Sequence, residues 1–308
     1  VDVVCTLCPL CEPHFHLCQS AQSVDDALQC LYNNTMDPDT IQRLLSLNHQ
    51  FYQTFAAPFS ATRQRLQPGV LRLLPAILPA ARILDLGCGN GELSRQLHQR
   101  GFQGSYLGLD FSAGLLAEAA RDFPPEQYRF IQADLASPPW LPPSEPPFDL
   151  ALAFAVLHHL PGAALRQQIT TEIRRLLTPA GRFIHSNWQF LNSPRLAGRV
   201  QPWSAAGLDE SALEPNDYLL DWRQGGPGLR YVHHFTEAEL AELAQSCGFT
   251  LLDSFHSDGE GGILGFYQIW QASPPPSPSP PSIVSSTIHP YNLFSSLSFM
   301  PTSPPSTP

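Results

Sequence analysis

Residues 83–97, ILDLGCGNGELSRQL, combine a carboxylate, three glycines and the start of a helix. Asp85 ends an apolar run, and Gly87, Gly89 and Gly91 follow at intervals of two residues. Glycine is required where the backbone takes positive φ or approaches a ligand closely. A glycine-rich turn between a strand and a helix therefore predicts a site for a nucleotide-like ligand.

The glycine spacing disfavours a dinucleotide. The fingerprint for NAD or FAD reads G-x-G-x-x-G, so that pyrophosphate rests on the N-terminus of the following helix. Here Glu92 stands where the third glycine is required. Its carboxylate would repel the pyrophosphate, so we expect a ligand without phosphates at this turn.

The D-x-G-x-G-x-G pattern resembles motif I of the class I S-adenosylmethionine (SAM) methyltransferases, and further motifs follow in the family's order. YLGLDFS ends a predicted strand at Asp110, whose carboxylate the resemblance assigns to the ribose hydroxyls. FIQADL ends at Asp134, which faces the adenine amino group in the family, beside the backbone of Leu135. FDLALAFAVLHHL brings Phe154 and Ala155 near the methyl donor. The resemblance implies these SAM-binding residues: Asp85, Gly87, Gly89, Gly91, Asp110, Asp134, Leu135 and Ala155.

Three other segments resemble one subfamily, the tRNA wobble-uridine carboxymethyl methyltransferases. They are FAAPFSATRQRLQPGV at 55–70, FAVLHHL at 154–160 and DYLLDWRQGGPGLRYVHHFTEAEL at 217–240. The resemblance spans about residues 45–270, and it implies esterification of a carboxymethyl group on C5 of the wobble uridine. It also implies tRNA as a partner and, as in eukaryotic members, a small zinc-binding activator subunit.

Carboxylate methylation suits the side chains in these segments. A carboxylate is already an anion near neutral pH, so the reaction needs no strong general base. Arginine can hold a carboxylate with two hydrogen bonds, and aromatic rings or histidines can stack on a base or fix it. The predicted catalytic residues are Arg63, His158 and Arg230, and the predicted substrate-binding residues are Tyr52, Trp222, Arg223, Tyr231 and His233.

Each of these residues has a structural alternative. Arg63 could neutralise a helix end, Trp222 and Tyr231 could be core residues, and His158 and His159 could cap the turn after a strand. Asp221 departs from the subfamily, which has proline before the tryptophan, and adds a negative charge beside the proposed RNA surface.

Strands that alternate with helices position these motifs. Helices are expected at 38–57, 68–78, 92–100, 113–122, 162–177 and 237–247, and strands at 82–86, 106–109, 128–132, 150–155, 182–187, 249–256 and 263–271. This order predicts an α/β, Rossmann-like sheet of seven strands, mostly parallel, with an antiparallel last strand and helices on both faces. Residues 36–272 would form the methyltransferase domain. The N-terminal helix with Tyr52, and an irregular insertion at 188–235, would close the substrate pocket.

The two ends of the chain differ from this domain. Residues 1–35 form a cysteine-rich extension, in which Cys5, Cys8, Cys11 and Cys18 have spacings that suit zinc or iron–sulfur, yet zinc modules usually separate two such pairs further. No metal ligand is therefore assigned. Residues 273–308 hold many prolines and serines and no charged residue, which predicts a disordered tail.

The composition of the chain limits the kinds of partner that it is expected to bind. The formal net charge of -10 disfavours a surface coated in positive charge for nucleic-acid binding, although residues 160–200 hold six arginines and one glutamate, a strip that could meet phosphates. No apolar run reaches the length of a membrane span and no secretion signal is evident, so a cytoplasmic protein is expected. Two alternatives remain open: a methyltransferase for a small metabolite, and a catalytically silent SAM-binding module that regulates a partner.

Overall fold

The computed structural model describes residues 36–55, 65–223 and 225–273. The chain divides into two units, 1–274 and 275–308, and every described residue belongs to the first. The predictions for Arg63, for the cysteine-rich extension and for residues 274–308 of the tail fall outside the described residues. Within the described part, no helix has both the length and the apolar character needed to cross a membrane.

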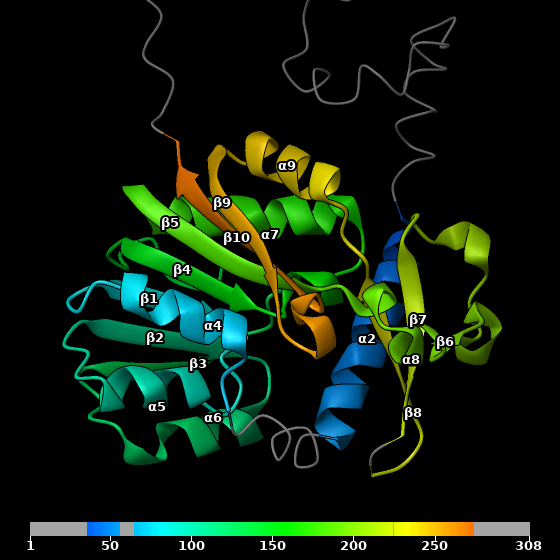
Figure 1. Ribbon diagram of the computed structural model, residues 1–308, viewed down its shortest axis with the longest axis horizontal. Helices are drawn as coiled ribbons and strands as arrows, with labels where there is room; N and C mark the ends of the chain where they lie inside the picture. The colour runs from blue at the N-terminus through cyan, green and yellow to red at the C-terminus, as the bar shows by residue number, and fades with distance from the viewer. Residues whose placement is uncertain (1–35, 56–64, 224, 274–308) are drawn as a thin grey trace, which may run out of the picture. The chain divides into compact units, whose positions relative to one another are not determined.

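A seven-stranded sheet forms the framework, as predicted (Figure 1). Its order is β3-β2-β1-β4-β5-β10-β9, with parallel pairing from β3 to β5 and antiparallel pairing of β10 with both β5 and β9. The strands are β1 Arg82–Leu86, β2 Ser105–Asp110, β3 Tyr128–Gln132, β4 Phe148–Phe154, β5 Leu177–Trp188, β9 Phe249–Ser257 and β10 Gly265–Ala272. The strand order reverses between β1 and β4, which is where open α/β sheets bind ligands.

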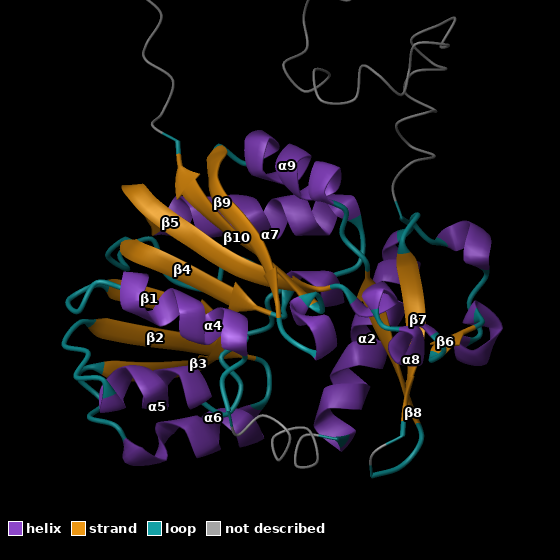
Figure 2. Ribbon diagram, in the orientation of Figure 1, coloured by secondary structure: helices purple, strands orange, loops and turns teal. Residues whose placement is uncertain are grey.

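Helices cover both faces of the sheet (Figure 2). The α-helices of the described residues are α2 Pro38–Thr54, α4 Pro68–Leu73, α5 Glu92–Gln99, α6 Ala113–Ala119, α7 Ala163–Leu176, α8 Pro194–Ala197 and α9 Glu237–Ser246. Leu84 and Leu86 of β1 point toward α7 and α9, whereas Ile83 points toward α4 and α5. This alternation follows from the two-residue period of a strand, and it gives the sheet a separate apolar core on each face.

The prediction of an irregular stretch at 188–235 was wrong in part. This region contains a second, three-stranded antiparallel sheet with β6 Val200–Gln201, β7 Asp217–Trp222 and β8 Gly228–His233. Gly225 and Gly226 between β7 and β8 have positive φ, and four of the six residues of β7 are buried. Glycines between two such runs are a hairpin signal that the sequence reading missed.

Helix α2 packs on this second sheet through Leu44, and its Leu45 belongs to the core of the large sheet. Asp37 caps its start by accepting from the Thr40 amide, and Pro38 occupies its first turn. On its buried face, Leu44 packs with Leu219 and Tyr231. The helix and the small sheet thus stand together beside the carboxyl ends of the central strands (Figure 1).

Candidate active site

One cavity of about 450 Å³ lies at the carboxyl ends of β1, β2, β4 and β5. The turn after β1 forms one side of it, and α2 with Arg230 of β8 forms the other. Its size falls in the range of small-molecule and cofactor sites, about 300 to 1,000 Å³. The cavity is therefore a candidate for both the predicted cofactor and the methyl acceptor.

The glycine turn has the backbone that its sequence predicts. Gly87, Gly89 and Gly91 all have positive φ. A Cβ on Gly87 would lie 2.6 Å from a methyl carbon of Val156, and one on Gly91 would lie 2.8 Å from the Cβ of Ala119. A Cβ on Gly89 would instead enter open space. Two of the glycines are thus needed for packing, and the middle one leaves room for a ligand against the backbone.

Asp110 fixes this turn to the end of β2. Its Oδ2 accepts the Gly89 amide at 2.9 Å, and its Oδ1 accepts the Ser112 amide at 2.9 Å. Burial raises the pKa of the Asp110 carboxyl, while the amide hydrogen bonds act to lower it. The carboxylate both holds the turn and lines the cavity, where its remaining lone pairs fit the ribose hydroxyls of the implied cofactor.

Helix α2 covers the part of the cavity where the adenine of the implied cofactor is expected. Asp134 and Leu135 line the cavity, and Asp134 Oδ1 accepts the Ala136 amide at 2.9 Å. His49 of α2 lies with its Nε2 3.8 Å from Asp134 Oδ1, and its ring stacks on Phe111 with centroids 4.7 Å apart. Neither ring was predicted from the sequence, although Phe111 directly follows the strand end at Asp110.

Asp85 is a buried carboxyl that lines the same cavity. Burial raises its pKa to about 7, the hydrogen bond from the Tyr106 hydroxyl acts to lower it, and the charge of Asp110 raises it. An ammonium group such as the amino end of SAM would stabilise the ionised form. These groups fit the implied cofactor. One carboxylate can accept from the ammonium, a second can accept from the ribose hydroxyls, and an open glycine backbone lies between them.

Cofactor affinity should depend on pH through Asp85. If the ammonium requires an ionised Asp85, the dissociation constant of SAM should rise by about tenfold for each pH unit below 7. The free protein should become less stable as the pH rises from about 4 to 7, because the pKa of Asp85 in the folded protein lies above the unfolded value of 3.8.

Calorimetry with S-adenosylhomocysteine (SAH) between pH 5.5 and 8.5, with thermal unfolding of the free protein, checks both trends. Asp85→Asn should bind more weakly, lose the pH dependence and unfold at a higher temperature at pH 8. An affinity that stays constant across this range in the wild type would contradict the assignment.

The end of β4 carries backbone strain at the predicted position. Ala155 has a φ of 58°, a region that residues with a Cβ rarely adopt. Its amide donates to the carbonyl oxygen of Ser186 at 3.0 Å and to the Ser186 hydroxyl at 3.1 Å. These bonds hold Ala155 at the cavity wall, where the resemblance places the methyl donor.

Arg230 is buried and lines the cavity from the small sheet. Its guanidinium carbon lies 4.6 Å from the ring centroid of Trp188, 5.4 Å from that of Phe51 and 5.6 Å from that of Trp222. Stacking engages the faces of a guanidinium and leaves its N–H groups at the edge, in the fork that matches a carboxylate. Trp188, which ends β5, was not among the predicted residues.

His158, for which a catalytic role is predicted, lines the cavity and has a defined tautomer. The Trp188 amide donates to His158 Nδ1 at 3.3 Å, so Nδ1 accepts and the neutral ring carries its proton on Nε2. His158 is therefore an N–H donor through Nε2. This suits the positioning of an anion and not the removal of a proton.

Tyr231 and His233 do not line the cavity, contrary to the substrate-binding roles expected for them. Both are buried, and both donate to Asp217 Oδ1 at 2.7 Å. His233 Nε2 lies 2.6 Å from Glu239 Oε1. Although burial lowers the pKa of His233, its hydrogen bonds to Asp217 and Glu239 outweigh this and raise it.

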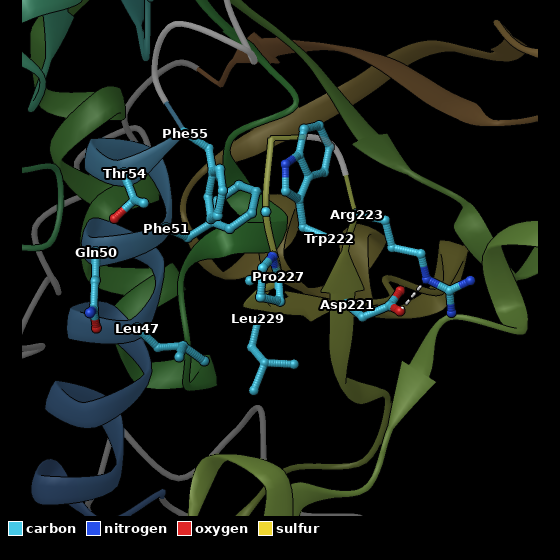
Figure 3. A pocket seen from close by; sticks show the side chains of 12 residues that line it. Leu47, Gln50, Phe51, Thr54, Phe55, Asp221, Trp222, Arg223, Pro227 and Leu229 are labelled. Carbon is cyan, nitrogen blue, oxygen red and sulfur yellow. Dashed lines mark hydrogen bonds and ion pairs between the residues drawn. The ribbon is translucent and has the colours of Figure 1, made fainter.

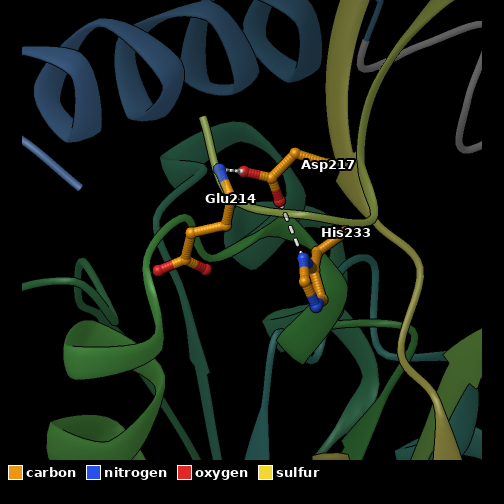
Figure 4. A group of neighbouring side chains, drawn as sticks. All are labelled: Glu214, Asp217 and His233. Atoms are coloured by element: carbon orange, nitrogen blue, oxygen red, sulfur yellow. Dashed lines mark hydrogen bonds and ion pairs between the residues drawn. The ribbon is translucent and has the colours of Figure 1, made fainter. Parts of the chain in front are cut away.

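The same cluster contains Glu214, so three potential metal ligands lie within 4.8 Å of one another (Figure 4). The carboxylates of Glu214 and Asp217 already accept hydrogen bonds from protein groups. Glu214 pairs with the buried Arg166 at 2.7 Å, and Asp217 accepts the Glu214 amide at 3.1 Å. Arg166 is one of the six arginines at 160–200; Arg175 pairs with Glu172, so this strip is not a continuous free basic face.

Trp222 and Arg223 line a different, open groove between the C-terminal half of α2 and the β7–β8 hairpin (Figure 3). The Trp222 ring packs on Phe51 and Phe55, and Arg223 is exposed and paired with Asp221 at 2.6 Å. Trp222 is not among the residues that line the cavity, and its ring centroid lies 5.6 Å from the guanidinium carbon of Arg230, which does line it. The structure therefore brings Tyr52, His158 and Arg230 together, and leaves Arg223 outside.

Comparison with known proteins identifies the family. A methyltransferase-domain model matches residues 83–181. A predicted methyltransferase from Encephalitozoon cuniculi is 32% identical over 207 residues, covering 67% of this chain and 88% of that protein. The tRNA (carboxymethyluridine(34)-5-O)-methyltransferase of Schizosaccharomyces pombe is 27% identical over 219 residues, covering 67% of this chain and 89% of that protein.

Two further matches complete this comparison. Trans-aconitate 2-methyltransferase of Methylobacterium nodulans is 42% identical over 158 residues, which is 50% of this chain and 57% of that enzyme. The crystal structure of a SAM-dependent methyltransferase from Methanosarcina mazei shares the fold, with a TM-score of 0.53 and 24% identity, over 68% of this chain and 99% of that one. The cavity where the strand order reverses is lined by groups that suit SAM, and the sequence matches known methyltransferases. This chain belongs to the class I SAM-dependent methyltransferases.

Proposed function

We propose that this methyltransferase esterifies a carboxylate, and that the carboxylate is the carboxymethyl group of a modified wobble uridine in tRNA. The observation that carries the proposal is Arg230, a buried guanidinium whose faces lie near three aromatic rings and which lines the cofactor cavity. Arginine suits a substrate carboxylate, because its planar guanidinium can donate two parallel hydrogen bonds to the two carboxylate oxygens.

The side chains of the cavity suit this reaction. Arg230 would hold the carboxylate, and His158 would donate from Nε2, so one oxygen is held in line with the methyl group. Bound SAM would supply the methyl group: the oxygen would form the new O–CH₃ bond as the C–S bond breaks, and the electron pair of that bond would go to sulfur. No proton is transferred, which agrees with a neutral His158 whose Nδ1 is occupied by a backbone amide.

A small polycarboxylate is the second candidate. It is favoured by the 42% identity with trans-aconitate 2-methyltransferase, although the matched region is about half of each chain. The net charge of -10 also favours a small substrate over a polyanion. The similarity to the tRNA enzyme of Schizosaccharomyces pombe extends over more of both chains, and this supports tRNA as the first choice.

A competition assay tests the proposal. The protein receives SAM with a labelled methyl group, trans-aconitate, and tRNA that carries 5-carboxymethyluridine at the wobble position. We expect label in this tRNA and none in a control tRNA with unmodified uridine. Label confined to trans-aconitate would assign the enzyme to small polycarboxylates, and label in neither would reject both candidates.

A further inference from the structure

A chain of hydrogen bonds links helix α2 to the small sheet through His159, a cavity residue for which no catalytic or binding role is predicted from the sequence. The Tyr52 hydroxyl lies 2.6 Å from His159 Nε2. On the other side of the ring, His159 Nδ1 lies 3.2 Å from the carbonyl oxygen of Tyr231. Tyr52 comes from α2, His159 from the turn after β4 and Tyr231 from β8, so the chain joins three elements.

The direction of these hydrogen bonds follows from the groups that take part. A carbonyl oxygen only accepts, so His159 Nδ1 must carry a proton and donate it to Tyr231. In a neutral imidazole the other nitrogen then accepts. The Tyr52 hydroxyl therefore gives its only hydrogen to His159 Nε2. Toward any other group, the Tyr52 oxygen can act only as an acceptor.

Asn48 holds this arrangement in place. Its side-chain nitrogen donates to the carbonyl oxygens of His159 at 3.1 Å and Tyr231 at 3.2 Å, and its oxygen accepts the Tyr231 amide at 2.8 Å. All three bonds are made to backbone groups next to the ring of His159 or next to Arg230. The position of Tyr52 is thereby fixed relative to the guanidinium that binds the anion.

Tyr52 and Arg230 both line the cavity, and both pack on Phe51. The Tyr52 ring centroid lies 5.0 Å from that of Phe51, and the guanidinium carbon of Arg230 lies 5.4 Å from it. We propose that Tyr52, oriented by His159, selects a substrate that carries an N–H or O–H donor on the same small group as its carboxylate. This inference rests on the proposed function and narrows its substrate class.

The two candidate substrates differ in this respect. The uracil ring of 5-carboxymethyluridine has an imide N–H at ring position 3, which can donate to the Tyr52 oxygen while the carboxylate binds Arg230. A tricarboxylate such as trans-aconitate has no N–H or O–H group near neutral pH. Its carboxylates would face the lone pairs of Tyr52, which is unfavourable. The hydrogen-bond direction thus favours the nucleobase.

A double-mutant cycle between enzyme and substrate tests the inference. The substrates are two anticodon stem-loops, one with 5-carboxymethyluridine and one with its N3-methyl derivative, which lacks the donor. For the wild type we expect kcat/KM to fall by about tenfold or more on N3-methylation, the loss of one hydrogen bond. In Tyr52→Phe the two substrates should differ by no more than about twofold, because the acceptor is absent.

The variant His159→Ala tests whether His159 orients the Tyr52 hydroxyl. It keeps Tyr52 but frees the hydroxyl to rotate, so the discrimination against the N3-methyl substrate should shrink, while SAH binding stays as in the wild type. Equal discrimination in all three enzymes would overturn the inference and leave carboxylate methylation intact. If the wild type methylates neither stem-loop, the proposed tRNA function and this inference both fail.

Discussion

Replacing Arg230 with methionine should lower kcat/KM for methyl transfer by about a hundredfold or more, because two charge-assisted hydrogen bonds to the substrate are lost. Methionine fills a similar volume between Trp188, Phe51 and Trp222, so the aromatic packing should persist. SAH should bind as tightly as to the wild type, since the glycine turn and the carboxylates of Asp85 and Asp110 are untouched. Steady-state kinetics with the labelled acceptor and calorimetry with SAH measure the two effects.

Two control variants sharpen this prediction. Arg230→Lys keeps the charge but loses the planar fork, so it should recover only part of the activity. Arg100→Met removes an exposed arginine at the C-terminus of α5, which does not line the cavity, and should leave activity unchanged. If Arg230→Met methylates its acceptor at the wild-type rate, Arg230 does not hold the substrate.

The substitution Asp110→Ala should weaken SAH binding by about a hundredfold or more. It removes the acceptor for the expected ribose hydroxyls, and it leaves the amides of Gly89 and Ser112 without their carboxylate partner. Each lost charged hydrogen bond is worth about 1.5 to 3 kcal/mol. Because the turn itself loosens, the loss should exceed that of a simple ligand contact. Calorimetry at pH 8, where Asp85 is ionised, gives the affinity.

Asp110→Asn is the matched comparison for this site. Its amide keeps one oxygen acceptor in nearly the same volume, so we expect an intermediate loss of affinity. Asp253→Ala, at an exposed position on β9, controls for the removal of a negative charge. An Asp110→Ala protein that is folded and binds SAH like the wild type would show that the cofactor lies elsewhere.

The cofactor half of the site could be predicted because its signals are local. Asp85, Asp110 and Asp134 each stand at or just beyond the end of an apolar strand, and the ends of parallel strands meet at one edge of a sheet. The glycines next to Asp85 report the backbone that they require. Short stretches of sequence therefore predict the strand ends that carry these carboxylates and the position of the turn.

The acceptor half depends on contacts between distant parts of the chain. Asn48 bonds to a residue 183 positions away, and Tyr52 to one 107 positions away. Tyr231 and His233 alternate along β8 with Arg230 and therefore point to the opposite face, where they bond to the buried Asp217. Residue type alone does not distinguish an aromatic that binds substrate from one that fills the core, because either role suits the same side chain.

The most direct test of carboxylate methylation is the chemical stability of the product. Label transferred from SAM is treated with mild alkali, which hydrolyses methyl esters to volatile methanol and leaves methyl groups on nitrogen, carbon or ether oxygen in place. If Arg230 holds a carboxylate for methylation, nearly all of the label should become volatile. Label that stays on the acceptor after this treatment would contradict the central claim, whichever molecule the acceptor proves to be.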